Sequence, residues 1–182
     1  MTSLEERDRL LSDQLCVVEE PGWKRTLAIL LTHTGDGGVW GVLLALAFFL
    51  GGPDWQYRAV VILIVTIVVG LITTAVKFTV KRPRPAHEWG EMYRKSDPNS
   101  FPSAHAARGG GMMVLGLVLG PLWFAIAMII WGPAIALSRV LTGVHYVSDV
   151  IGGMVFGAAM TGLVLVLIDL TDIVERLGFA AI

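Results

Sequence analysis

The chain has 182 residues, of which 54% are hydrophobic and 16% are charged, and its mean hydropathy is +0.68. A soluble domain of this length is less apolar, so the composition indicates an integral membrane protein with a single domain. The net charge of −1 gives no reason to expect a nucleic-acid partner. The single cysteine, Cys16, excludes an internal disulfide and a metal site built from cysteines.

Residues 2–20 are predicted to form an amphipathic helix that ends at Pro21-Gly22. Leucine and valine side chains gather on one side of this helix, and charged side chains on the other. Such helices lie on a membrane surface or pack on another subunit. We therefore predict an interfacial helix over residues 1–22, which also offers a surface for a homo-oligomer, and a transmembrane domain over residues 23–182.

Five membrane crossings are expected in that domain, at residues 26–50, 57–80, 104–119, 122–141 and 146–170. A helix needs roughly 20 residues to cross a hydrocarbon layer of about 30 Å. Neither half of segment 26–50 reaches this length, so we expect one crossing that is broken at its glycines. His33 and Asp36 lie in the break and either face the active side or cap the second half; we favour capping by Asp36. The predicted fold class is an all-α, polytopic transmembrane helical bundle.

Three polar clusters follow this pattern of crossings, at residues 77–85, 101–105 and 138–149. The end of the second crossing, the start of the third, the end of the fourth and the start of the fifth fall on one side of the membrane, so the three clusters are expected to meet there. Charged residues at the ends of membrane helices are costly to hold and are usually functional. A capped helix end with a surface salt bridge is the simpler alternative for the third cluster alone.

The third cluster contains the candidate nucleophile. If a helix begins near Val144, His145 and Asp149 lie on one face and can touch. A carboxylate beside an imidazole fixes its tautomer and prepares the other ring nitrogen for attack. A chain reversal at Gly143 would bring Arg139 alongside, and a guanidinium beside an activated imidazole indicates phosphate chemistry.

The other two clusters add cations and a helix start. Lys77, Arg84 and Arg139 are predicted to surround the oxygens of a phosphoryl group and to stabilise their charge. Ser103 is a natural N-cap, and the free backbone N–H groups that follow it can bind an anion. His105, near the same helix start, can protonate the leaving oxygen.

We expect structural roles for three other polar residues in or near the first cluster, Lys81, Arg82 and His87. Lys81 and Arg82 are expected to extend to the membrane interface, and His87 is expected to be a loop residue. The clusters place cations where a metal enzyme would place carboxylates, so neither a catalytic metal nor a cofactor is expected.

The spacing Lys-x6-Arg-Pro, Pro-Ser-x-His and Ser-Arg-x5-His-x3-Asp in the three clusters resembles the type 2 phosphatidic acid phosphatases, a family similar to the vanadium-dependent haloperoxidases. The resemblance implies metal-independent hydrolysis of a phosphomonoester or diphosphate through a phosphohistidine. It also implies that residues 23–182 form the family's helical bundle. Ala104 stands where the family has glycine; alanine keeps the backbone N–H, so we expect activity to survive.

The sequence therefore predicts a multi-pass lipid phosphatase of the cell membrane. Phosphatidic acid, phosphatidylglycerol phosphate, a polyprenyl phosphate or diphosphate, and a phosphorylated glycolipid all remain open as substrates. The alternatives are a phosphotransferase with the same site, a vanadate-dependent oxidase, and a non-catalytic scaffold or transporter. Arg7, Arg9, Lys24 and Arg25 lie on the side of the site, and by the positive-inside rule they favour a cytoplasmic site.

Overall fold

The structure is a computed structural model that describes residues 3–19 and 21–179. Its elements are α1 (Leu4–Leu15), α2 (Trp23–His33), α3 (Gly37–Leu50), α4 (Pro53–Val80), the 3₁₀ helix η1 (Glu88–Gly90), α5 (Glu91–Ser96), α6 (Ala104–Leu119), α7 (Leu122–Leu141), α8 (Val147–Thr171) and α9 (Ile173–Arg176). Within the described ranges no strand forms, which confirms the predicted all-α fold. Residues 1–2 and 20 of the predicted N-terminal helix, and 180–182 of the predicted domain, lie outside these ranges.

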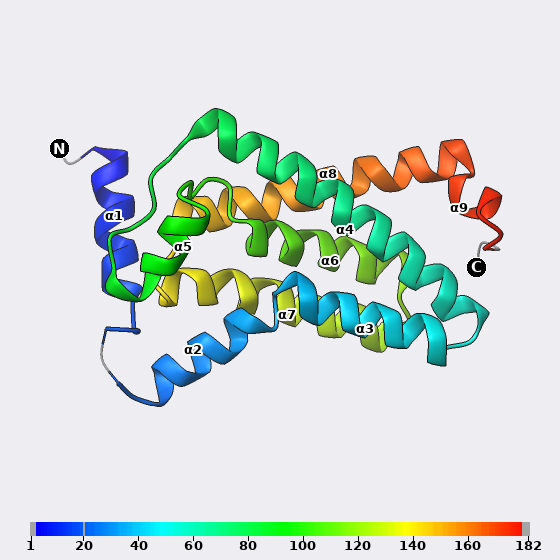
Figure 1. The fold of residues 1–182 in the computed structure, drawn as a ribbon, viewed down its shortest axis with the longest axis horizontal. Helices are drawn as coiled ribbons and strands as arrows, with labels where there is room; N and C mark the ends of the chain where they lie inside the picture. Colours follow the sequence, from blue (N-terminus) through cyan, green and yellow to red (C-terminus); the bar gives the residue numbers. More distant parts are fainter. Residues whose placement is uncertain (1–2, 20, 180–182) are drawn as a thin grey trace.

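Helices α4, α7 and α8 run along the molecule and α6 lies among them (Figure 1). It packs most extensively on α8 and α7, and also on α4. The bent pair α2 and α3 adds to this bundle from the side, with α2 on α7 and α3 on α4. Helices α1 and α5 stand at one end of the bundle, and α9 stands at the other.

Glycines allow α6 and α8 to approach until their backbones touch. A Cβ atom added at Gly157 would lie 1.9 Å from the carbonyl oxygen of Ala107, and one added at Gly110 would lie 2.1 Å from that of Met154. Small residues permit this kind of approach between helices in lipid, where burial of apolar surface does not drive association. The contact fixes the start of α6 against the start of α8.

Judged by helix length, the described residues contain fewer membrane crossings than the five that we expected. Within the described residues, α4, α7 and α8 are long and apolar enough to cross a membrane, and α2 with α3 makes a fourth if the pair is one span. That pair is bent by 55° at residues 34–36, so the predicted break is confirmed. Helix α6 has 16 residues and a length of about 24 Å, so the crossing expected at residues 104–119 stays a prediction.

Helix α1 is attached to the end of the bundle. The Val17 N–H donates to the Leu141 carbonyl at 2.9 Å, Leu15 packs on a small apolar cluster, and Val18 is buried. Leu4 and Leu10 on the same helix are exposed. One part of the predicted apolar side therefore faces the protein, while the location of the other part at a membrane surface or in an oligomer stays a prediction.

Candidate active site

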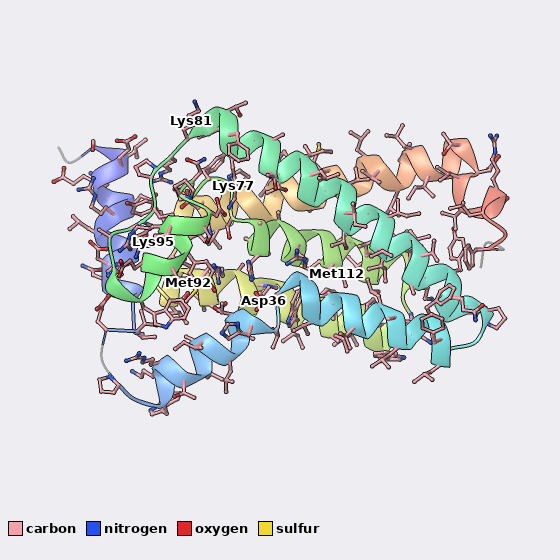
Figure 2. All side chains as sticks on the ribbon, in the orientation of Figure 1. Asp36, Lys77, Lys81, Met92, Lys95 and Met112 are labelled. Carbon is pink, nitrogen blue, oxygen red and sulfur yellow. The ribbon has the colours of Figure 1, made fainter. Side chains whose placement is uncertain are left out.

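The three polar clusters meet at the end of the bundle that carries α1 and α5 (Figures 1 and 2). Lys77 lies in the last turn of α4, and Ser103 directly precedes α6. The Ser103 N–H donates to the Asp149 carbonyl at 3.1 Å, and the Ser100 N–H donates to the Arg82 carbonyl at 2.7 Å. The first bond joins the end of the loop of residues 81–103 to the start of α8, and the second joins the two ends of that loop to each other, so the clusters come together.

A tight turn places the third cluster. Gly143 has a φ of +64°, a left-handed conformation that glycine adopts without a steric penalty. The N–H groups of Val144 and His145 both donate to the Arg139 carbonyl, at 3.2 and 3.3 Å. Helix α8 begins at Val147, later than we predicted, so His145 lies in the turn and not on the helix.

His145 still contacts Asp149. The distance from Nδ1 to the Asp149 Oδ2 atom is 3.5 Å, and both side chains are buried. This is longer than a good hydrogen bond, and such contacts often shorten only when substrate binds. The predicted pairing of the two residues is therefore present, although it arises from the turn before the helix.

Arg84 defines the protonation state of this imidazole. Its NH1 group lies 2.9 Å from His145 Nε2, and a guanidinium can only donate hydrogen bonds. Nε2 thus carries the lone pair and Nδ1 carries the proton. Burial, followed by the charges of Arg84, Arg139 and Lys77, holds the pKa of His145 well below its ordinary value. A neutral ring whose Nε2 carries a lone pair is the form that a nucleophile requires, and here that lone pair accepts a hydrogen bond from Arg84.

An internal carboxylate pairs with two of the three predicted cations. Lys77 and Arg84 are 5% and 7% exposed. Arg84 NH2 donates to Asp97 Oδ2 at 2.7 Å, and Lys77 Nζ forms an ion pair with the same oxygen. The Arg84 Nε–H also donates to the backbone carbonyl of Asp97 at 2.6 Å. Asp97 therefore holds an anionic oxygen beside the reactive imidazole.

Arg139 is more deeply buried, at 1% exposure, and is less well paired. Among the residues that the structure describes, its Nε and NH1 groups find no hydrogen-bond partner. Its guanidinium carbon lies 4.8 Å from the centre of the Tyr93 ring, which belongs to α5. A buried cation with open N–H groups is costly to hold without an anion, so Arg139 is a candidate for binding an anionic ligand.

Arg82 departs from our expectation that it reaches the membrane interface. Its NH1 group donates to Asp149 Oδ1 at 2.7 Å, and its NH2 group donates to Asp8 Oδ2 at 2.8 Å. The guanidinium also lies 4.3 Å from the centre of the Tyr146 ring. The earlier interpretation is wrong because a fully buried Asp149 carboxylate needs a cation. Lys81, its neighbour, is exposed.

The second histidine sits at the start of α6 and is held by a carboxylate from the α2–α3 break. Ser103 Oγ accepts a hydrogen bond from the Ala106 N–H at 3.4 Å, which confirms the predicted N-cap. Asp36 makes no side-chain cap to α3. Its two oxygens instead lie 2.9 Å from His33 Nδ1 and 3.1 Å from His105 Nε2. Asp36 therefore occupies the N-cap position of α3, as predicted, but its side chain does not cap the helix, and the break in the first crossing delivers this carboxylate to His105.

The structure thus brings Lys77, Arg84, Arg139, His145 and Asp149 together as predicted, with Ser103 and Ala104 at the adjoining helix start. Sequence reasoning missed two residues of the long polar loop that contact these cations, Asp97 and Tyr93. The polar segment between α4 and α6 has no hydrophobic periodicity from which contacts could be predicted. Only the excess of cations predicted at the site could have indicated that a carboxylate of the protein pairs with them. His87 lies in this loop, as expected.

Neutral imidazole and buried cations at the end of an apolar bundle define a membrane protein that binds an anionic group. The chain belongs to the PAP2 superfamily, whose family model matches residues 58–170. It is 32% identical over 159 residues to a decaprenylphosphoryl-5-phosphoribose phosphatase of Mycobacterium tuberculosis, covering 85% of this chain and 86% of that one. It is 29% identical to a lipid A 1-phosphatase of Rhizobium etli, covering 76% and 69%.

A solved structure shows the same fold. The transmembrane PAP2 type phosphatidylglycerolphosphate phosphatase of Bacillus subtilis superposes with a TM-score of 0.73 and 22% identity. The match covers 93% of this chain and 88% of that chain. The predicted family and the predicted membrane helical bundle are therefore confirmed.

Proposed function

We propose that the chain removes the phosphate from the head group of a membrane lipid, and that the phosphoryl group passes through His145. The observation that carries this proposal is a buried, neutral imidazole whose Nε2 lone pair faces the buried cation Arg84. The relatives named above are phosphatases of phosphorylated lipids, and they support the same reaction class. A non-catalytic scaffold gives no reason to bury these charges together, because charged groups in a membrane protein are costly to hold.

The substrate phosphate would bind where protein groups now satisfy the cations. Its oxygens replace the Asp97 carboxylate on Lys77 and Arg84, and they accept hydrogen bonds from the open N–H groups of Arg139. When Arg84 turns to the phosphate, it also releases the lone pair of His145. Three cations then surround the charge that develops on the oxygens during transfer.

The reaction would proceed in two displacements. First, His145 Nε2 forms a bond to phosphorus while the bond between phosphorus and the lipid oxygen breaks, and this oxygen takes a proton from His105. Asp149 stabilises the positive ring through the Nδ1 proton. Water then attacks phosphorus, the phosphorus–nitrogen bond breaks, and His105 accepts the proton of the water. Asp36 fixes the orientation of His105 throughout.

The lipid part of the substrate would stay outside the bundle. Large apolar side chains are exposed along the outer surfaces of α4 and α8, for example Ile67, Leu71 and Val155. These surfaces suit the hydrocarbon of a bilayer, whereas the cations lie at the end of the helices. We therefore propose a substrate whose phosphate is at the membrane interface. Phosphatidic acid, phosphatidylglycerol phosphate, polyprenyl phosphates and phosphorylated glycolipids would be compared side by side.

Replacement of the nucleophile tests the proposal directly. His145→Ala should abolish phosphate release, while the purified protein keeps the melting behaviour of a folded bundle. Brief incubation of the parent with radiolabelled substrate and rapid quenching should trap phosphate on His145. Arg176→Ala, at the opposite end of the molecule, serves as the control. Retention of more than a few percent of activity in His145→Ala would contradict the assignment.

Two further measurements separate the roles and the mechanism. His105→Ala should lose most activity on substrates with poor leaving groups, because a good leaving group needs little protonation. Equal losses on both substrate types would contradict the role as acid. Vanadate should inhibit and excess chelator should not, since the proposed steps use only side chains. Loss of activity on chelation that magnesium restores would contradict this mechanism.

A further inference from the structure

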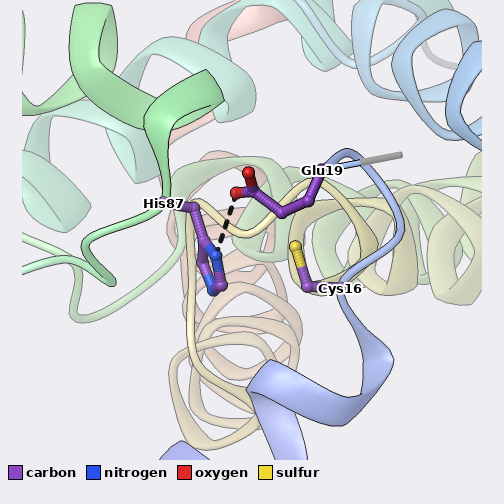
Figure 3. A group of neighbouring side chains, drawn as sticks. All are labelled: Cys16, Glu19 and His87. Carbon is purple, nitrogen blue, oxygen red and sulfur yellow. Dashed lines mark hydrogen bonds and ion pairs between the residues drawn. The ribbon is translucent and has the colours of Figure 1, made fainter. Parts of the chain in front are cut away.

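A second cluster of reactive side chains lies beside the candidate active site, where the end of α1 meets the loop that follows α4. Cys16, Glu19 and His87 turn toward one another in Figure 3. One ligand atom from each of them, a thiol sulfur, a carboxylate oxygen and a ring nitrogen, lies within 4.8 Å of the other two. The proposed reaction uses none of these residues.

The two ring nitrogens of His87 have different partners. Nδ1 lies 3.1 Å from Glu19 Oε1, and Nε2 lies 3.2 Å from Asp13 Oδ1. Metal-bound histidines commonly donate their second ring N–H to a carboxylate, which fixes the tautomer and the ring orientation. Asp13 is placed for this supporting role, and Nδ1 is the nitrogen left for a metal.

We propose that Cys16, Glu19 and His87 bind a zinc ion, through the thiolate, a carboxylate oxygen and Nδ1, with Asp13 orienting the imidazole. Zinc bonds of about 2.0–2.3 Å in tetrahedral geometry separate ligand atoms by roughly 3.3–3.8 Å. The observed distance between Nδ1 and Oε1 is already near this value, and the limit of 4.8 Å leaves a small contraction for the sulfur. A water molecule completes the fourth position.

The mixture of ligands selects the kind of metal. Thiolate and imidazole favour zinc and similar transition metals, whereas magnesium and calcium prefer oxygen atoms. One thiolate is enough for such a mixed site, so the single cysteine is no obstacle. Cys16, Glu19 and His87 line a surface pocket that Lys24 and Arg25 also line. These two cations would disfavour a metal ion, and the negative charge of the Cys16 thiolate offsets part of the positive charge that the ion brings.

The position of the site suggests its effect on the protein. It would connect α1 to the loop that carries Arg82 and Arg84, and it adjoins the turn before His145. A Cβ atom added at Gly143 would lie 2.9 Å from the Cys16 sulfur and 2.7 Å from the His87 ring. The zinc would therefore stabilise the packing of three segments next to the candidate active site, and it would take no part in phosphoryl transfer.

Cobalt titration of the intact chain tests this inference. Tag-free protein in detergent, freed of metal by chelator, should bind one Co²⁺ with a thiolate charge-transfer band and the visible absorption of tetrahedral cobalt, and Zn²⁺ should displace it. Cys16→Ser should lose the charge-transfer band, and His87→Gln should weaken binding at least tenfold. His33→Gln, another exposed histidine paired with a carboxylate, and His145→Ala should bind like the parent.

A second measurement uses the unaltered chain, so it tests the site even if the substituted proteins fail to fold. Cys16 is its only cysteine, so alkylation reports on this thiol alone, and Zn²⁺ should slow it at least tenfold. Absence of a cobalt spectrum, a band retained in Cys16→Ser, or alkylation unaffected by Zn²⁺ would overturn the site. Phosphatase activity in chelator decides the proposed reaction separately, because the two readouts are independent.

Discussion

The Asp97 carboxylate occupies the place proposed for the substrate phosphate, and Arg84 covers the ring nitrogen of His145 that is proposed to attack it. Asp97 supplies an anionic oxygen to Lys77 and Arg84, and Arg84 in turn covers Nε2 of His145. Both contacts must give way before a phosphate can reach the imidazole. At the scale of single residues, Lys77 and Arg84 are therefore already paired within the protein, and we propose that binding exchanges the Asp97 carboxylate for the substrate phosphate.

Substitution of Asp97 measures this competition. Asp97→Asn keeps the shape of the side chain but removes its charge, so we expect KM for the lipid phosphate and the inhibition constant of vanadate to fall roughly tenfold, the equivalent of about 1.4 kcal/mol. The melting temperature should fall as well, because Lys77 and Arg84 lose their anion. Asp54→Asn, at the start of α4, is the matched control. An unchanged or higher KM in a folded variant would show that Asp97 does not compete.

The buried imidazole should also make stability depend on pH. His145 lies between α7 and α8, and burial with nearby cations holds its pKa well below the ordinary value of 6.5. As the pH falls through about 6.5, the unfolded chain takes up a proton on this residue and the folded chain does not. His145 therefore lowers the free energy of unfolding below about pH 6.5 and has no such effect above it.

This effect is measured by comparing thermal unfolding of the parent and His145→Gln between about pH 5 and pH 8. The parent should lose more stability toward acid than the variant. The acid side of the kcat/KM profile should also reach below pH 6.5, because the neutral nucleophile persists there. Identical pH dependence of the two proteins would contradict the assigned protonation state.

Single elements show what the sequence could and could not reveal. The lengths of the apolar segments and the glycines that interrupt them predicted the helices. The Ser103 N-cap was predicted because this residue directly precedes an apolar segment. Arg82 and Asp97 were not recognised because both lie in a loop without periodicity, and their partners come from other segments. Asp36 was misinterpreted because a helix break looks the same whether its carboxylate caps the helix or reaches another side chain.

The loop residue Arg82 provides a prediction at this scale. It is the cation for a carboxylate with 0% exposure, that of Asp149, and it also holds Asp8 of α1. Arg82→Met should destabilise the protein by about 3–5 kcal/mol, since removal of one partner leaves a buried charge unpaired, and should lower phosphate release. Lys81→Met changes the adjacent exposed lysine in the same way and should be nearly silent. Similar stability of the two variants would refute the buried ion pair.

The contact between α6 and α8 gives a second prediction for an element. Gly157→Ala would drive a methyl group into the Ala107 carbonyl, so the helices must separate. We expect a loss of at least about 1–3 kcal/mol of stability and reduced activity, because both helix starts belong to the candidate site. Gly162→Ala lies on the same helix with no atom within 4 Å of the added carbon, and it should be tolerated. Equal melting temperatures would contradict the close packing.

For the whole molecule, the structure agrees with the prediction that the N-terminal helix lies at the same end of the bundle as the candidate site. Helix α1 and the candidate site lie at one end of the bundle, and α9 lies at the other (Figure 1). Hydropathy could predict the apolar segments, including the short one at residues 104–119, but not that α2 and α3 meet at 55° or that α6 packs on α4, α7 and α8. Those features depend on packing between helices that are distant in the sequence.

The side of the membrane that carries the site remains our prediction, and it is cytoplasmic. A phosphate site collects positive charge for its own reasons, but Lys24 and Arg25 in the first turn of α2 belong to none of its contacts described above, and they count under the positive-inside rule. We propose to introduce single cysteines at Ser96 and Thr171 in a Cys16→Ser background. Both positions are exposed, at opposite ends of the bundle.

An impermeant thiol reagent applied to intact cells should label the cysteine at Thr171 and leave the cysteine at Ser96 unmodified until the cells are opened. Phosphate release by each variant checks that it is folded. The reverse labelling pattern would place the site on the outer face and would require substrates that reach the outer leaflet. With the expected pattern, the head group must be phosphorylated on the inner leaflet, so the enzyme would act on lipids at the side where they are made.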